Sequence, residues 1–384
     1  MKKKLIKPMK KMSLRQKIFF SGLSLIVLSL VLFLTGEWAI RASGWGSPRH
    51  QELYEDTLLK GKPNAQYWEL AEGRNRVILN NWGFHDWDRN PRSEKWRTLV
   101  LGDSFVAGMQ VPTSDLMTTR LEEAFQEAGQ SAEVINAGVP GANTPYEYML
   151  WKKFFEDRIE VNQIILCIYL GNDLANNTKA LHQLTGRPLL NYGIYFNEAG
   201  EIETHRLMVH PFQEFVRGLT RYSALLNFIY TRLYLLKQAG EKSALSDYLE
   251  GRKQDPGFRE EREEAWEESK GWTLRLIDRW AGELKRQKIQ FRVVLISAPP
   301  NQDEGKNLRA VLRFVSELEV WGERAGVPVL NMSFPDYRPE DIYTKRGKTY
   351  GHFNQTGHTV AAMKIYRWLK QDGKWPPSEK KDLV

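Results

Sequence analysis

The chain has 384 residues, of which 42% are apolar and 12% aromatic, enough to bury a large core in one α/β domain with insertions. Its net charge of +8 invites the hypothesis of a nucleic-acid partner, but the excess is local. Residues 1–17 hold eight of the 55 basic side chains and no acid, and the basic residues that remain equal the 47 acidic ones. The charge distribution therefore argues against nucleic-acid binding.

The basic tail, residues 1–17, runs directly into an uncharged segment, Ile18 to Gly36, with the sequence IFFSGLSLIVLSLVLFLTG. Nineteen residues at about 1.5 Å each cover nearly the full hydrocarbon thickness of a bilayer. Positive charge before the segment and mixed charge after it predict a single-pass protein with its N-terminus inside. A cleaved signal peptide is the alternative, but EWAIRASG is a poor small-residue cleavage site. We expect an uncleaved anchor over 18–36 and a periplasmic or extracellular domain.

Residues 37–96 have the composition of a juxtamembrane lead-in, rich in Trp, Gly, Pro and Asn, that connects the anchor to a domain at 97–376. In that domain short β-rich runs alternate with helical patterns. This alternation predicts a doubly wound, mostly parallel five-stranded sheet of the α/β class, covered by helices on both faces. The predicted strands are Arg97–Gly102, Glu133–Asn136, Gln163–Leu170, Phe291–Ser297 and Val327–Leu330. The predicted helices are Ser114–Glu127 with Ser114 as N-cap and Gly129 as stop, Tyr146–Asp157, Glu261–Lys288, Asn307–Ala325 and Thr356–Lys370.

Residues 175–260 interrupt the alternation of strands and helices. The segment FQEFVRGLTRYSALLNFIYTRLYLLKQ has helical spacing of Phe, Leu and Tyr, and a highly charged stretch follows it. We interpret 175–260 as a mostly helical insertion between the third and fourth strands. The sequence leaves open whether it forms a lid over a site or a shoulder that faces the membrane.

Four segments that follow predicted strands each bring a residue suited to acyl transfer, namely Ser104, Gly141, Asn172 and His352. Ligands of open α/β sheets bind at the carboxyl ends of the strands, so these residues are expected to meet. A serine hydroxyl becomes a nucleophile when an imidazole accepts its proton. The backbone N–H groups of Ser104 and Gly141 and the amide of Asn172 would then stabilise the oxyanion.

Other polar residues near these segments are better explained structurally. His358 lies at the start of a predicted helix, and Asp103 and Asp173 are expected to bond nearby loop backbone. The single cysteine, Cys167, lies in the apolar run IILCIYL and is expected to be a core residue. The chain has no Cys/His metal motif and no phosphate-binding Gly-rich loop, so no metal or cofactor is expected.

The four blocks together resemble the SGNH (GDSL-like) hydrolase superfamily over about residues 76–371. GDSF at 102–105 looks like the family's first block, NAGVPG at 136–141 its second, GND at 171–173 its third and HFNQTGH at 352–358 its last. The resemblance implies a flavodoxin-like SGNH fold and a membrane-anchored bacterial enzyme. It assigns Ser104 as nucleophile, His352 as base, and Ser104, Gly141 and Asn172 as the oxyanion hole.

The chain departs from the family pattern at the acid of the triad. Family members usually carry an aspartate two or three residues before this histidine, where this chain has Tyr350 and Thr349. Three alternatives stay open. The acid comes from elsewhere, with Asp336, Glu340 and Asp341 nearest in sequence; a Ser104–His352 dyad acts alone; or catalysis is lost.

The resemblance and the anchor together predict a membrane-anchored serine ester hydrolase, an esterase or deacetylase, or an O-acyltransferase. Acetylated surface polysaccharide is the expected substrate, and the 13 tryptophans are compatible with sugar stacking. Two alternatives are a non-catalytic binding or scaffold protein of polysaccharide assembly and a lipid-directed esterase with an apolar lid over 205–240. The acyl group, the acceptor and the oligomeric state are not readable from the sequence.

Overall fold

Five parallel strands form the central sheet of the computed structural model, which describes residues 12–55, 57–70, 72–186, 192–206, 211–252, 255–297, 308–332, 341–345 and 348–373. The sheet has the order β11-β10-β7-β5-β6. In chain order this is the flavodoxin-like pattern, in which the first strand lies between the second and the third. The strands are β5 (Trp96–Gly102), β6 (Ala132–Gly138), β7 (Gln163–Tyr169), β10 (Gln290–Ile296) and β11 (Val329–Met332). The predicted fold class is confirmed, and only the fifth strand begins two residues later than expected.

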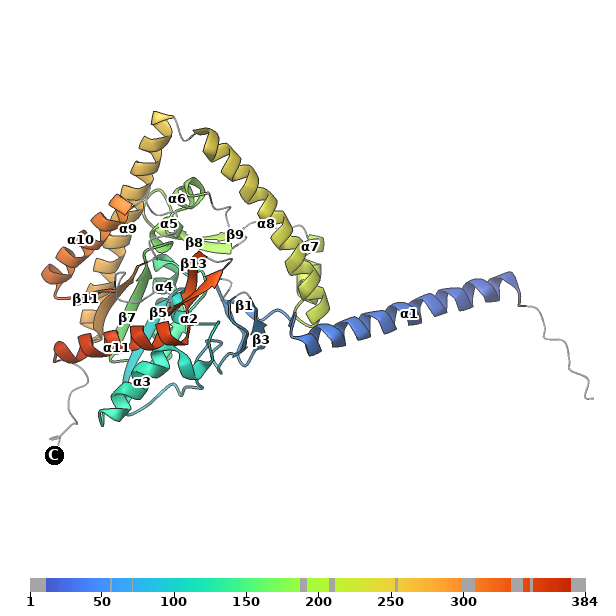
Figure 1. The fold of residues 1–384 in the computed structure, drawn as a ribbon, viewed down its shortest axis with the longest axis horizontal. Helices are drawn as coiled ribbons and strands as arrows, with labels where there is room; N and C mark the ends of the chain where they lie inside the picture. Colours follow the sequence, from blue (N-terminus) through green and yellow to red (C-terminus); the bar gives the residue numbers. More distant parts are fainter. Residues whose placement is uncertain are drawn as a thin grey trace, which may run out of the picture.

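Helices cover both faces of the sheet (Figure 1). Successive side chains of β5 alternate between the two cores, with Leu99 and Leu101 in one and Val100 in the other. The first core packs against α4 (Thr144–Leu150), α9 (Pro256–Arg286) and α10 (Leu308–Ala325). The second packs against α3 (Met117–Glu127) and α11 (Gln355–Gln371). Strands buried on both faces explain the continuously apolar runs of the sequence.

Several helix boundaries differ from the prediction, and the largest difference is at α9, which begins at Pro256 instead of Glu261. Ser114 lies inside a short 3₁₀ turn, Thr113–Asp115, and Leu116 stands at the N-cap of α3, so the assignment of Ser114 as the cap is wrong. The turn takes the residues that the hydrophobic pattern assigned to the first helical turn. Beyond α4 the chain continues as a π-helical turn, Trp151–Phe155, which completes the predicted 146–157 element. Gly129 has φ +74° and ends α3 as expected.

The lead-in segment, taken for a connection, contains regular structure that the sequence analysis missed. It forms two antiparallel hairpins, β1 (Gln51–Tyr54) with β2 (Leu58–Gly61) and β3 (Gln66–Glu69) with β4 (Asn75–Ile78). Four-residue strands that are only half covered carry too little apolar alternation to be recognised. Residues 79–95 are irregular, as their composition predicts.

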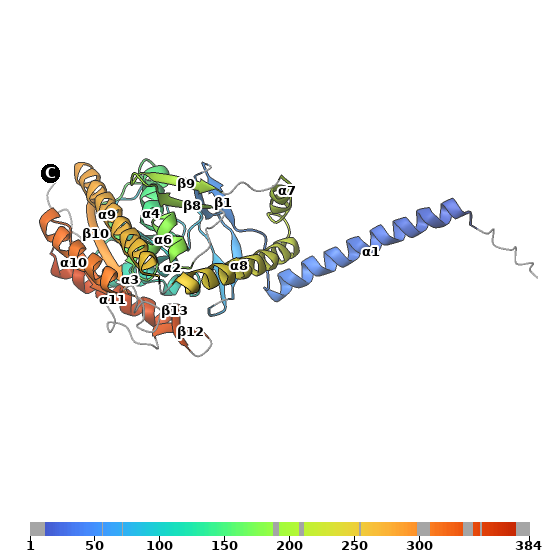
Figure 2. The ribbon, with the colours of Figure 1, turned by 90° about the horizontal axis from the view of Figure 1, so that it is seen from above.

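The insertion is mostly helical, as predicted, but it also contains a β-hairpin. After α5 (Asp173–Asn176) and α6 (Lys179–Leu184) it forms a hairpin of β8 (Tyr192–Phe196) and β9 (Ile202–Arg206). Two helices follow, α7 (Pro211–Leu219) and α8 (Ala224–Arg252), and α8 packs against α1 (Leu14–Ser43). Figures 1 and 2 show the first turns of α8 beside the root of α1, the end of this helix that joins the domain. In the described part of the chain, α1 is the one helix long and apolar enough to cross a membrane, and a signal sequence would pass the same test.

Candidate active site

Ser104 opens the short helix α2 (Ser104–Ala107) directly after β5. Asp103 caps this helix, because its Oδ1 accepts a hydrogen bond of 2.9 Å from the backbone N–H of Phe105. As the first residue of a helix, Ser104 has a backbone N–H without an intrahelical acceptor. The turn thus places the hydroxyl and a free backbone donor together at the carboxyl end of the sheet, beside the point where the strand order reverses.

The neighbouring strand β6 holds this turn by close backbone contact. A Cβ atom on Gly138 would lie 2.2 Å from the backbone nitrogen of Ala107, a distance that real Cβ atoms do not reach. Asn136 adds a direct bond, since its Nδ2 donates to the carbonyl of Val106 at 2.9 Å. The glycine and the asparagine of the NAGVPG block therefore position α2 and, with it, Ser104.

His352 lies near the end of β13 (Lys348–Phe353), which pairs with β12 (Ile342–Lys345). Its Nε2 is 2.7 Å from the Oγ of Ser104. The same hydroxyl is 3.4 Å from Oδ2 of Asp103, so the imidazole is its closer partner. The two predicted catalytic residues, 248 positions apart, are thus within hydrogen-bond distance.

The other ring nitrogen of His352 contacts Glu72. Oε2 of Glu72 is 2.8 Å from Nδ1 and also accepts the backbone N–H of His352 at 2.9 Å. A carboxylate can only accept, so Nδ1 carries the ring proton and Nε2 is left to accept the proton of Ser104. Ser104, His352 and Glu72 therefore lie in the order and at the distances that a nucleophile–base–acid array requires.

The sequence analysis missed Glu72, which lies in the loop between β3 and β4, outside all the candidates near His352. Asp336 and Glu340 lie outside the described residues, and Asp341 contributes its backbone carbonyl as the acceptor for Asn354. The two short segments on either side of AEGRN are the signal from which a hairpin could have been predicted. They do not indicate whether Glu69 or Glu72 contacts His352. The chain has no carboxylate at positions 349 and 350, and the carboxylate next to His352 comes instead from Glu72 in the lead-in segment.

The hairpin that carries Glu72 is attached to the segment that follows the nucleophile. Nδ2 of Asn75, at the start of β4, donates to the carbonyls of Met109 at 2.9 Å and Val111 at 2.6 Å. Tyr67 and Val77 of the two strands form a small buried cluster that also contacts Met109. The acid and the nucleophile are therefore held by the same piece of chain, although 32 positions separate them.

The electrostatic environment of His352 favours a charged ring. Burial disfavours the imidazolium, but the hydrogen bond and charge of Glu72, with more distant contributions from Asp103 and Glu69, raise its pKa above the ordinary value. For Asp103 burial dominates and raises the pKa, against hydrogen bonds from Phe105, Ser104 and Asn172 and the charge of His352. The site is thus built to stabilise the positive charge that His352 gains when it takes a proton.

The two remaining oxyanion-hole candidates lie on loops at the same edge of the sheet. Gly141 has φ +79°, and a Cβ built on it meets no atom within 4 Å, so the backbone conformation rather than crowding requires glycine. Asn172 follows β7, and its side-chain amide hydrogen-bonds the carboxyl group of Asp103. This bond ties the third block of the sequence to the residue next to the nucleophile.

The residues assigned structural roles occupy them. Oδ2 of Asp173 accepts the backbone N–H of Tyr169 at 2.7 Å, and Cys167 is 1% exposed in the core. His358 is fully buried, and its Nδ1 accepts the backbone N–H of Met117 at 3.2 Å. Across the described ranges, no group of three or more His, Cys, Asp or Glu side chains is arranged to hold a metal ion.

No protein-family model and no curated protein matches the chain. Among solved structures it is similar to the lipase/acylhydrolase from Enterococcus faecalis, at 13% identity and a TM-score of 0.39, over 74% of this chain and 99% of that one. A member of the lipolytic G-D-S-L family from Veillonella parvula DSM 2008 is 10% identical with a TM-score of 0.39, over 72% and 99% of the two chains. The psychrotrophic esterase EstA from Pseudoalteromonas sp. is 11% identical with a TM-score of 0.39, over 72% and 97%.

The order of the strands, the four blocks at their carboxyl ends and the contact between Ser104 and His352 are properties of the chain itself. By these properties the chain resembles the SGNH (GDSL-like) hydrolases, and the carboxylate beside His352 is that of Glu72, not of a residue two or three positions before the histidine.

Proposed function

We propose that the chain is an SGNH-type serine hydrolase that cleaves ester bonds through an acyl-enzyme. The observation that carries the proposal is the chain of contacts from Ser104 Oγ to His352 Nε2 at 2.7 Å and from His352 Nδ1 to Glu72 at 2.8 Å. A scaffold protein that had lost turnover would have no need of three side chains in this order. The array therefore favours an enzyme over the non-catalytic alternative.

The array supplies each proton transfer of the reaction. Oγ of Ser104 attacks the acyl carbonyl while Nε2 of His352 takes the hydroxyl proton, and Glu72 stabilises the imidazolium. The backbone N–H groups of Ser104 and Gly141 and the amide of Asn172 are the proposed donors to the oxyanion. His352 then returns its proton to the departing alcohol, and a water or a second hydroxyl, deprotonated by His352, releases the acyl group from Ser104.

The proposed setting is the outer face of a membrane. Helix α1 has 30 residues, about 45 Å at ~1.5 Å per residue, and none of its apolar window is buried against the rest of the chain. We propose that it is an uncleaved single-pass anchor with the N-terminus inside and the domain in the periplasm or outside the cell. Acetylated surface polysaccharide is the proposed substrate, with a deacetylase or an O-acyltransferase as the two outcomes.

The lipid-directed esterase is the weaker candidate, since it was argued from a lid over the site at 205–240. Helices α7 and α8 instead pack against each other, and α8 packs against α1. In Figure 1, α7 lies on the side of the domain from which α1 extends.

A fluorophosphonate probe tests the proposal on the full chain in detergent. The probe should label the folded protein between about pH 6 and 9, because a serine activated by an imidazole attacks phosphorus as it does a carbonyl. Ser104→Ala should abolish the label, whereas Ser131→Ala, at an exposed serine, should keep it. Folded wild type that takes up no label would refute the enzyme proposal. Aryl acetates and longer acyl esters then define the acyl group.

A further inference from the structure

The corner between α7 and α8 is hydrogen-bonded to the end of α1. The carboxylate of Glu37, directly after the apolar 18–36 segment, accepts the backbone N–H groups of Ala224 and Leu225, each at 2.9 Å, and the hydroxyl of Ser223 at 2.7 Å. One turn later, Nη2 of Arg41 donates to the carbonyl of Tyr222 at 3.1 Å. Glu37 thereby caps α8. Residues 222–225 are thus held at the level where α1 leaves its apolar stretch.

An apolar stripe on and just after α7 lies beside this corner. Phe212, Phe215 and Leu219 follow one another by three and four positions, which places them on one face of α7, and Tyr222 follows in the turn after the helix. Phe215 is 63% exposed and Tyr222 is 79% exposed. In Figures 1 and 2 α7 is on the side of the domain from which α1 extends. The stripe therefore belongs to the side of the domain that is nearest to a bilayer around α1.

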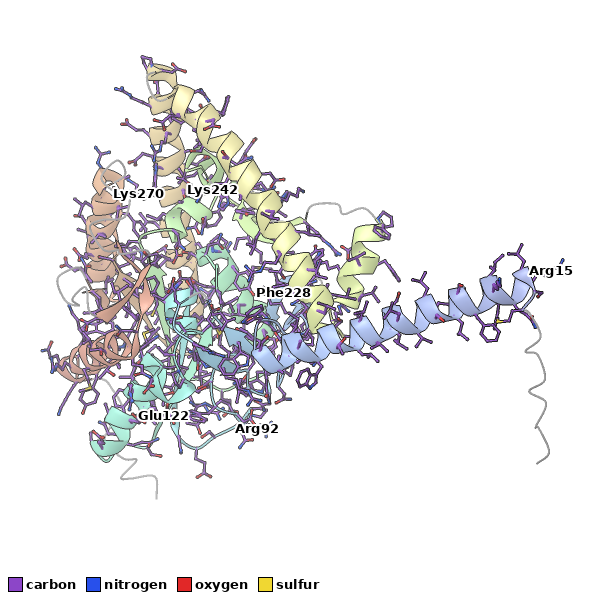
Figure 3. All side chains as sticks on the ribbon, turned by 45° about the vertical axis from the view of Figure 1, so that its right-hand side comes forward. Arg15, Arg92, Glu122, Phe228, Lys242 and Lys270 are labelled. Atoms are coloured by element: carbon purple, nitrogen blue, oxygen red, sulfur yellow. The ribbon has the colours of Figure 1, made fainter. Side chains whose placement is uncertain are left out.

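Other features mark the same level. Trp38 and Trp45, at the end of α1 and just beyond it, are 72% and 65% exposed, and tryptophan is enriched where membrane meets water. Figure 3 shows Phe228 near the root of α1, with Arg15 at the far end of the helix and Lys242 far along α8. Trp38 and Trp45 thus lie at the end of α1 that joins the folded domain.

A cleft of about 430 Å³ with an excess of positive charge opens next to the stripe. Lys62, Arg206 and Arg221 line it together with Glu52, Leu53 and Tyr222. Arg49 and Arg217 lie close by and form, with Lys62, Arg206 and Arg221, a basic cluster of five side chains. Two acids face this cluster. Glu52 pairs with Lys60 at 3.2 Å, and Glu214 lies 3.7 Å from Arg206 and 3.6 Å from Arg217. Five cations thus face two acids, of which Glu52 pairs with Lys60 outside the cluster and Glu214 pairs with Arg206 and Arg217 inside it.

Within the described part of the chain, the side chains of Arg49, Lys62 and Arg221 have no ion pair or hydrogen bond. Burial lowers the pKa of Arg49 to about 10, and the like charges of Arg217 and Arg221 contribute in the same direction. Arg49 stays charged at neutral pH, so the cations of the cluster repel one another. A bound anion would reduce this repulsion. Phosphate groups are the anions that arginine forks bind best.

We propose that the cleft binds the phosphate of an anionic membrane phospholipid while the α7 stripe inserts among the acyl chains around it. The inference rests on the proposed membrane anchor and goes beyond the hydrolase activity. Basic side chains next to an apolar helical face are the combination that peripheral membrane helices use. The contact would fix the tilt of the domain and, with it, the direction in which Ser104 faces.

Spin-label depth measurements on the full chain in proteoliposomes test the proposal. Single cysteines at Leu28, Phe215 and Leu312 carry a nitroxide, in a Cys167→Ala background that leaves no other thiol. Oxygen and a polar nickel chelate then report lipid or water around each label. Position 28 tests the anchor, position 215 tests α7, and position 312, exposed on α10, is the aqueous control. We expect 28 in the bilayer centre, 215 below the headgroups and 312 in water.

The results separate the two proposals. A water-exposed label at 215 with 28 buried in lipid would overturn the α7 contact and leave the anchor standing. A label at 28 in water would overturn the anchor and the inference built on it. The hydrolase proposal is tested independently by the fluorophosphonate label.

A second comparison tests whether the position of α7 depends on the negative charge of the lipid. Bilayers with about a third phosphatidylglycerol should hold the label at 215 deeper than pure phosphatidylcholine. Arg221→Glu should abolish this difference, whereas Arg259→Glu, an exposed arginine on α9, should preserve it. Equal depth in both bilayers for the wild type, or an equal loss in both variants, would overturn the phosphate site.

Discussion

Replacing Glu72 by glutamine tests the assignment of the acid, because it keeps the size of the side chain and removes its charge. In the wild type Oε2 of Glu72 lies 2.8 Å from Nδ1 of His352 and stabilises the imidazolium that forms as Ser104 loses its proton. Glutamine can still accept from Nδ1 with its carbonyl oxygen. The variant therefore isolates the charge from the hydrogen bond.

The size of the effect follows from the separation and the exposure of the pair. Opposite unit charges about 4 Å apart attract by about 4 kcal/mol at an effective dielectric constant of about 20 and by about 1 kcal/mol in water. The side chains of His352 and Glu72 are 31% and 13% exposed, which places the pair closer to the first limit. About 3 kcal/mol of lost stabilisation corresponds to a ~10²-fold decrease in kcat/KM.

The assay is aryl acetate hydrolysis by the full chain in detergent, together with the rate of fluorophosphonate labelling. Glu69→Gln is the matched control, since it removes the same charge from the same hairpin but acts on His352 only through distance. We expect it to stay within about threefold of the wild type, and Glu72→Asp to recover part of the activity. A Glu72→Gln variant as active as Glu69→Gln would refute the triad and leave the Ser104–His352 dyad.

Three further predictions follow from the contacts around the site. Because the base must be neutral and Glu72 raises the pKa of His352, activity should fall on acidification at a pH above the ordinary histidine value, and in Glu72→Gln this limb of the pH–rate profile should move to lower pH. Gly138→Ala should lower the melting temperature and slow fluorophosphonate labelling, because the new Cβ would lie 2.2 Å from the backbone of α2. The control is Gly282→Ala on α9, where the nearest atom to the new Cβ is 3.7 Å away. This control should leave stability unchanged or raise it by up to ~1 kcal/mol. Glu147 is fully buried, neither of its carboxyl oxygens has a hydrogen-bond partner among the described residues, and burial raises its pKa far above the ordinary value. Its carboxyl group therefore stays protonated in the folded state but ionises in the unfolded state above about pH 4.5, so the wild type should lose stability as the pH rises. Urea unfolding of Glu147→Gln at about pH 5–8 should show a weaker dependence of stability on pH. An unchanged slope would contradict the burial of an unpaired carboxyl group.

Much of the sheet could be predicted because parallel strands buried on both faces must be apolar throughout. The runs that became β5, β7 and β10 carry this signal without help from the rest of the fold. The same holds for Ser104 and Asn172, which follow β5 and β7, whereas His352 lies in the antiparallel hairpin of β12 and β13 and was predicted from the resemblance of its sequence block. Their chemistry was readable because the carboxyl ends of parallel strands converge on one edge.

The hairpins of the lead-in segment were not readable, for a physical reason. Strands such as Gln66–Glu69 are short and partly exposed, so their stability comes from contacts with the domain rather than from their own pattern. The acid of the triad was lost with them. No local feature distinguishes Glu72 from Glu69, and only the docking of Asn75 onto the carbonyls of Met109 and Val111 decides which carboxylate meets His352.

Local sequence thus determined the nucleophile, the base and the sheet that presents them, because strand burial and helix capping act over a few residues. The carboxylate that partners His352 was decided by the contact with Glu72, 280 positions away in the chain. The position of the corner between α7 and α8 at the end of α1 was decided by the contact of Glu37 with Ala224, 187 positions away. A carboxylate takes its role from the donor that it reaches, and folding alone selects that donor.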